Sequence, residues 1–89
     1  MAVATLEAMQ RDGLVMSVAR ALSAANEAAA KQGTDVAASL VTITEEQSPV
    51  GRIWRIHYGP RDYISRRGGD LSILVDERTA MVQQVIRGQ

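Results

Sequence analysis

The 89-residue chain contains no cysteine and no phenylalanine, and its aromatic residues are one tryptophan and two tyrosines. The absence of cysteine excludes disulfides, zinc fingers, iron–sulfur clusters and thiol catalysis. A single histidine, His57, argues against a metal site built from imidazoles. The chain also lacks the glycine-rich phosphate loops and nucleophile motifs of common enzymes. We therefore expect a protein that is not an enzyme, with no catalytic residues, no cofactor and no metal.

Long hydrophobic runs are also missing. No stretch approaches the 18 apolar residues of a membrane-spanning helix. Residues 1–7 lack the basic segment and the apolar segment of a signal peptide. We expect no membrane span and a cytoplasmic location, with an exported protein whose leader has been removed as the alternative.

Neither sign of charge is in excess, because ten basic residues balance ten acidic ones. They are unevenly spread: residues 1–50 carry a net charge of −3, and residues 51–89 carry +3. This asymmetry gives the folded surface a dipole rather than a strongly basic face. Nucleic acid is therefore not an expected partner.

One helical segment stands out in the first half of the sequence. Its apolar residues recur with the period of one helical face. They are Val15, Val18, Leu22, Ala25 and Ala29. Asp12 is suited to the N-cap, and Gly33 to a left-handed C-cap. The pattern predicts a helix over residues 13–32 with this stripe facing the core.

Residues 1–12 also have helical character, but on another face. Leu6 and Met9 lie about half a turn away from the Val15 stripe at 100° per residue. One straight helix cannot bury both sets in the same core. Either a break near Asp12-Gly13 makes residues 1–12 an arm or short separate helix, or Leu6 and Met9 contact a partner chain.

After Gly33 the apolar period changes to two. Strands are predicted over residues 36–46, 52–58, 71–75 and 81–86, joined by short polar turns. Such connections favour an antiparallel meander over residues 36–87. The chain is thus predicted to be a single α+β domain (residues 1–89), with one long N-terminal helix packed on a four-stranded antiparallel sheet.

The second strand alternates cleanly between two faces. Trp54, Ile56 and Tyr58 are predicted to face the helix, where Ala25 and Ala29 leave room for the indole. An alternative is that small residues opposite an aromatic strand leave a cavity for a small molecule.

Arginines concentrate beside the Gly68-Gly69 pair. Such a cluster suits a carboxylate or phosphate, and the alternative is a solvated loop. Two residues of the neighbouring strand extend the patch. The candidate binding residues are Arg55, His57, Arg61, Arg66 and Arg67.

The second half of the sequence resembles PepSY-like domains. Trp54-Arg55-Ile56, followed by Val75-Asp76 and Thr79-Ala80-Met81-Val82, is similar to their Trp-x-Val … Val-Asp-x-x-Thr-Gly-x-Val pattern, with Ala80 in place of the usual glycine. The order of elements also resembles small cystatin-like and NTF2-like bacterial domains, some of them immunity proteins. Residues 47–51 (Gln-Ser-Pro-Val-Gly) are similar to the cystatin Gln-x-Val-x-Gly loop, with Pro49 in place of valine. The resemblance implies a cystatin-like roll, and it implies no catalytic residues.

These observations together favour a chain that works by binding. The expected partner is another protein, including a second copy of the same chain in a homodimer, because so small a core is commonly supplemented by association. The alternative is a small-molecule or anion binder that uses the helix–sheet cavity and the loop bearing Arg61, Arg66 and Arg67.

Overall fold

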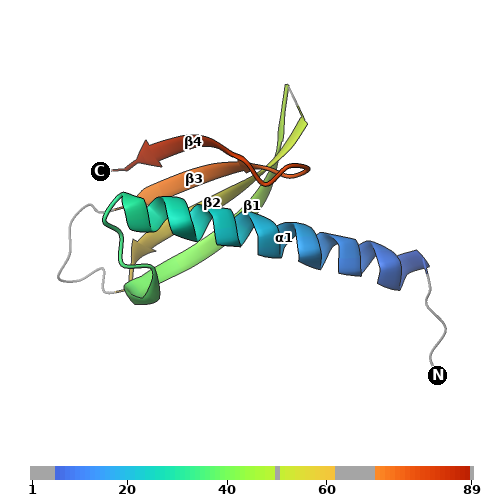
Figure 1. Ribbon diagram of the computed structural model, residues 1–89, viewed down its shortest axis with the longest axis horizontal. Helices are drawn as coiled ribbons and strands as arrows, with labels where there is room; N and C mark the ends of the chain where they lie inside the picture. Colours follow the sequence, from blue (N-terminus) through green and yellow to red (C-terminus); the bar gives the residue numbers. More distant parts are fainter. Residues whose placement is uncertain (1–5, 50, 62–69, 89) are drawn as a thin grey trace.

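The computed structural model describes residues 6–49, 51–61 and 70–88, with side chains described from Gly13 onward. One helix, α1 (Leu6–Lys31), packs on a single antiparallel sheet (Figure 1). The strands are β1 (Ser39–Ser48), β2 (Gly51–Pro60), β3 (Leu71–Asp76) and β4 (Val82–Arg87), and they lie in sequence order. The predicted α+β architecture, one helix on a four-stranded antiparallel meander, is confirmed.

The helix is longer than the sequence predicted. It begins at Leu6 rather than at Gly13, and it runs through Asp12-Gly13 without the expected break. A glycine inside a helix lowers its stability by only about 1 kcal/mol relative to alanine, so good helix formers on both sides carry the helix past it. A Cβ built on Gly13 would meet nothing within 4 Å, so no close contact requires a glycine there.

The end of α1 follows the prediction. Gly33 has φ = 83°, in the left-handed region. Its amide donates to the carbonyl of Ala30, and the amide of Thr34 donates to the carbonyl of Ala29, both at 3.0 Å. This pair of bonds is a Schellman motif, which satisfies the last carbonyls of the helix.

A short 3₁₀ helix, η1 (Val36–Ala38), stands where the first strand was expected to begin. Asp35 caps it, because its Oδ1 accepts a hydrogen bond from the Ala38 amide at 3.3 Å. The Ser39 hydroxyl donates to the Asp35 carbonyl at 2.7 Å. Local bonds from these two side chains therefore delay β1 until Ser39, against the β propensity of Val36.

The register of the sheet puts one set of residues on the helix side. Trp54, Ile56 and Tyr58 of β2 lie opposite Val75, Ile73 and Leu71 of β3. On the other flank, Val41 and Ile43 of β1 lie opposite Tyr58 and Ile56. The alternation predicted for β2 is confirmed.

The turn between β3 and β4 is tight and contains a strained residue. Asp76 Oδ1 accepts hydrogen bonds from the amides of Arg78 and Thr79 at 2.8 and 3.0 Å. Ala80, a non-glycine residue, adopts φ = 59°, in the left-handed region. Its amide donates to the Asp76 carbonyl at 2.9 Å, which keeps the turn closed despite the strain. A register shift next to Leu74 and Val75 follows, so β4 pairs through a bulge.

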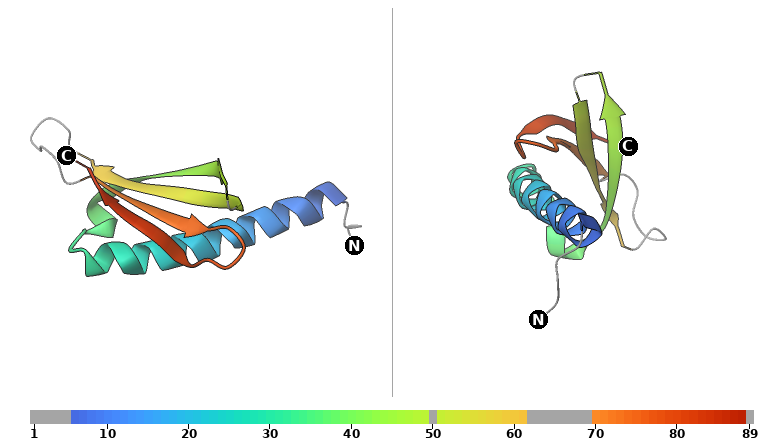
Figure 2. Two further views of the ribbon diagram at one scale, coloured as in Figure 1. Left: turned by 90° about the horizontal axis from the view of Figure 1, so that it is seen from above. Right: turned by 90° about the vertical axis from the view of Figure 1, so that its right-hand side faces the viewer.

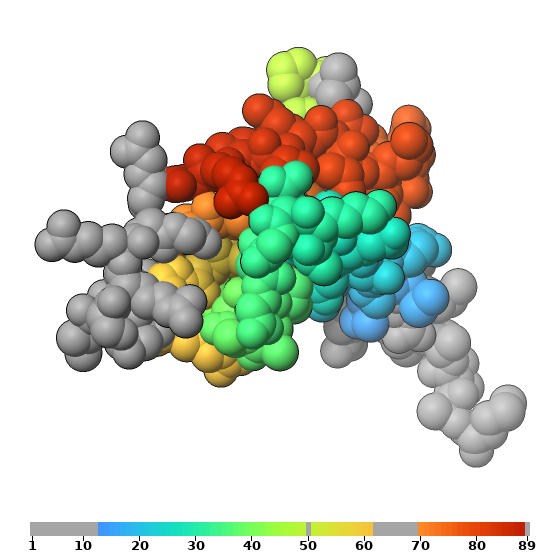
Figure 3. Space-filling view, turned by 60° about the vertical axis from the view of Figure 1, so that its left-hand side comes forward, coloured from blue at the N-terminus to red at the C-terminus, as the bar shows by residue number. Residues whose placement is uncertain are grey.

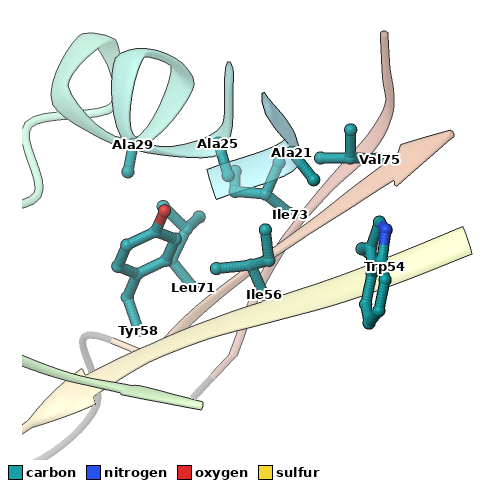
Figure 4. Close-up of a cluster of buried hydrophobic side chains, with 9 residues drawn as sticks. All are labelled: Ala21, Ala25, Ala29, Trp54, Ile56, Tyr58, Leu71, Ile73 and Val75. Carbon is teal, nitrogen blue, oxygen red and sulfur yellow. The ribbon is translucent and has the colours of Figure 1, made fainter. Parts of the chain in front are cut away.

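Figure 4 shows the core between the helix and the sheet. Alanines form the buried stripe of α1, and large side chains of β2 and β3 fill the space below them. The stripe is Ala21, Ala25 and Ala29. Val18 and Leu22 pack against it and are partly buried, whereas Val15 is 63% exposed. The expectation that Val15 faces the core is wrong, because the sheet does not reach that turn of the helix.

Helix and sheet differ in length, and this mismatch shapes the molecule. Twenty-six helical residues span about 39 Å, whereas the six residues of β3, the strand on which the helix mainly packs, span about 20 Å. Ser17 of α1 contacts the β3–β4 turn, because its hydroxyl donates to the Glu77 carbonyl at 3.2 Å. The part of α1 before Ser17, called the overhang here, extends past the sheet (Figure 2).

Candidate interaction surface

The structure places the candidate anion-binding arginines in existing interactions. Arg55 forms a forked ion pair with Glu46, with Nε 2.6 Å from Oε2 and a second nitrogen 3.4 Å from Oε1. Arg61 donates from Nε to the Ser39 carbonyl at 3.2 Å. Arg66 and Arg67 lie outside the described residues. Where the structure describes them, these arginines thus bind groups of their own chain.

His57 lies on the sheet face opposite the helix, as predicted, and is half-buried there. Its Nε2 is 3.3 Å from Asp70 Oδ2. Thr42 and Ser72 stand opposite His57 on the neighbouring strands. In the described part of the chain, the hydrogen-bond partner of the imidazole is Asp70 and neither of these hydroxyls.

Metal-binding chemistry finds no support in the described side chains. Among them, no three histidine or acidic residues are grouped so that they could hold an ion. On this sheet face Asp70 lies beside His57, and Glu46 pairs with Arg55.

Two partly buried polar contacts fasten the helix to the sheet, and neither was predicted from the sequence. The indole Nε1 of Trp54 donates to Ser17 Oγ at 2.9 Å. The hydroxyl of Tyr58 donates to Asn26 Oδ1 at 2.6 Å, and burial raises the pKa of this phenol to about 12. Ser17 and Asn26 lie on the flanks of the alanine stripe, where a hydropathy pattern predicts only that they face solvent.

Two carboxyl groups at the β3–β4 turn have pKa values shifted in opposite directions. Backbone hydrogen bonds from Thr79 and Arg78 lower the pKa of Asp76. The Glu45 side chain, which adjoins Glu77, raises the pKa of that carboxyl. The Nη1 atom of Arg52 is 3.9 Å from Glu45 Oε2, and its positive charge offsets part of the negative charge at this end of the sheet.

The overhang exposes large apolar side chains. Leu14, Val15 and Met16 are 49%, 63% and 54% exposed. They are consecutive, so they point in different directions around the helix and cannot all be covered by this chain's own sheet. Leu6 and Met9 belong to the same segment, and their side chains lie outside the described part of the structure.

The two edges of the sheet are protected to different degrees. At the β4 edge, the Arg87 side chain donates to the carbonyl and the side-chain oxygen of Gln32, at 2.7 and 3.1 Å. This contact holds the end of α1 against the strand (Figure 3). The bulge next to Val75 and the short length of β4 further reduce its capacity to pair with another strand.

The β1 edge has none of these protections over most of its length. All ten residues pair with β2 in one unbroken register. The strand contains no proline and no lysine, and it begins Ser-Leu-Val-Thr-Ile-Thr, which has high β propensity. The helix packs mainly on β3 and β2 and also reaches β4, so the helix-side residue Ile43 stays 37% exposed. This strand is the best-formed open edge of the described structure.

No protein-family model, curated protein or solved structure matches this chain. The helix of the described residues is not long and apolar enough to cross a membrane.

Proposed function

We propose that this chain is a non-catalytic protein-binding module that acts by associating with itself. The observation that carries the proposal is the open β1 edge with apolar residues beside it. An edge strand without proline, lysine or a bulge is a template for pairing with another strand. Exposed apolar side chains on the overhang supply a second surface of the same character.

The size of the chain supports association. A domain of 89 residues buries a limited fraction of its surface, and α1 covers only part of one sheet face. Burial of the remaining apolar side chains between two copies adds stability that the single chain lacks. The resemblance to PepSY-like and cystatin-like domains stays a prediction; it is compatible with a binding role.

No contact in the described part of the structure specifically favours the alternative function, anion or small-molecule binding. It relies on free arginines and on a cavity beside Trp54. Arg55 already forms an ion pair with Glu46, and the indole is 6% exposed and hydrogen-bonded to Ser17.

Sedimentation equilibrium of the full chain between about 10 µM and about 1 mM tests the proposal. We expect a mass that rises with concentration from 9.6 kDa to twice that value. A mass of one chain at every concentration would reject the self-associating module.

A further inference from the structure

We infer that two copies of this chain pair through β1, antiparallel, with the two-fold axis at Thr42. This inference rests on the proposed function and specifies its geometry. It joins the two four-stranded sheets into one continuous sheet with both helices on the same side.

The direction follows from symmetry. Two identical edges related by a two-fold axis meet as antiparallel strands, and each contact occurs twice. Directly opposed residues in such a pair lie on the same face of the sheet. Helix-side residues of one copy therefore meet helix-side residues of the other when the axis passes through a residue of β1.

The register follows from the apolar side chains and the charges. With the axis at Thr42, Val41 stands opposite Ile43 of the second copy, and Ile43 opposite Val41 of the second copy. These are the helix-side apolar residues of β1, and Ile43 is the one that the single chain leaves exposed. Cross-strand pairs of β-branched residues contribute about 0.2–1 kcal/mol each.

The same register separates the acidic end of the strand from its copy. Glu45 then faces Ser39, the first residue of β1 in the second copy, and Glu46 lies beyond the paired strands, beside η1. Arg61, bonded to the Ser39 carbonyl, is a basic group at that end, so opposite charges approach. An axis at Ile43 would place Glu45 against Val41, and an axis near Glu45 would oppose like charges, so both registers are weaker.

The β4 edge fits self-pairing less well. It has six residues, a bulge next to it, and a terminal arginine engaged with Gln32. We therefore place the second copy on β1.

Cysteine cross-linking tests the register, and the chain has no native cysteine to interfere. The variant Thr42→Cys places two thiols directly opposite each other, at a Cα separation of about 4.5–5.5 Å, which a disulfide accommodates. Thr44→Cys is the matched control. It is also exposed and faces the same side, but its thiols would lie about 13 Å apart along the strands.

Under mild oxidation we expect a reducible dimer from Thr42→Cys and at least tenfold less from Thr44→Cys. Equal cross-linking of both variants, or none from Thr42→Cys, would overturn the inference. A second variant, Ile43→Lys, places two charges in the apolar pair, so we expect association at least tenfold weaker in sedimentation with an unchanged circular dichroism spectrum. Unchanged association of Ile43→Lys would also overturn it.

The outcomes separate this inference from the proposed function. If the wild-type chain dimerises but Thr42→Cys fails to cross-link and Ile43→Lys associates normally, the module stands and the contact is elsewhere, for example on the overhang. If the wild-type chain stays monomeric, both are rejected.

Discussion

The two ends of α1 differ in which side chains are buried. Toward its C-terminus, small side chains carry the contact, and Ala25 is completely buried. Toward its N-terminus, the larger Val15 is 63% exposed. Intrinsic hydrophobicity alone would rank these two positions the other way.

The difference shows that burial along this helix depends on what lies opposite. Tyr58, Ile56 and Trp54 supply the bulk from the sheet, so alanine on the helix lets the two backbones approach. Before Ser17 the helix extends past the sheet (Figure 2), and there the larger side chain of Val15 stays mostly exposed. Each of the following experiments changes either the covered end of α1 with its sheet contacts or the overhang.

The largest expected effect is at Trp54, at the boundary between the covered end and the overhang. Trp54→Ala removes the indole and its bond to Ser17, so we expect a loss of about 3–5 kcal/mol in the free energy of unfolding. Urea denaturation followed by circular dichroism measures this. A variant with an unchanged midpoint would mean that the indole contributes no packing.

Enlarging the covered stripe comes next. Ala25→Leu inserts three carbons where the helix meets the sheet, and overpacking of this kind costs about 1–3 kcal/mol. Ala19→Leu is the control, because Ala19 is exposed on the same helix and leucine has good helix propensity. Equal midpoints for the two variants would contradict the assignment of the buried face.

Alkaline pH tests the covered end without changing its packing. The folded pKa of Tyr58, about 12, is above the usual value of 10.0. The unfolded chain therefore loses this proton first, and stability that is complete below pH 10 decreases as pH rises toward 12. We expect a decrease of about 1–2 kcal/mol in the free energy of unfolding over this interval. Tyr58→Phe should flatten that part of the profile, and an equally steep profile would assign the effect to other groups.

The smallest expected effect is on the overhang. Val15→Ser replaces an exposed side chain, so the unfolding free energy of the monomer should change by less than about 0.5 kcal/mol. Thermal denaturation at a few micromolar provides the measurement. A large loss there would show that the overhang is packed in the isolated chain.

The strands could be predicted because their signal is local. Alternation from Ile53 to Tyr58 determines which side chains share a face of the sheet. The backbone preference of Gly33 ends the helix, and the Asp76 side chain favours the turn after β3. These features need no knowledge of the rest of the molecule, and the structure confirms them.

The helix phase and the partners of the arginines could not be predicted in the same way. The stripe through Val15 assumed a sheet as long as the helix, a property that no local pattern contains. Likewise, the pairing of Arg55 with Glu46 depends on the β1–β2 register, which places Glu46 diagonally across from Arg55. Non-local register, rather than residue type, decided whether this arginine was available for a ligand.

The bond between Trp54 and Ser17 gives the molecule a built-in optical probe. Trp54 is the only tryptophan in the chain, and its nearly buried ring touches the helix where the covered end gives way to the overhang. Its fluorescence therefore reports the docking of α1 rather than an average over many sites. Detachment of the helix would bring water to the indole and shift its emission to longer wavelength, while a partner settling on the overhang would leave the wavelength nearly constant.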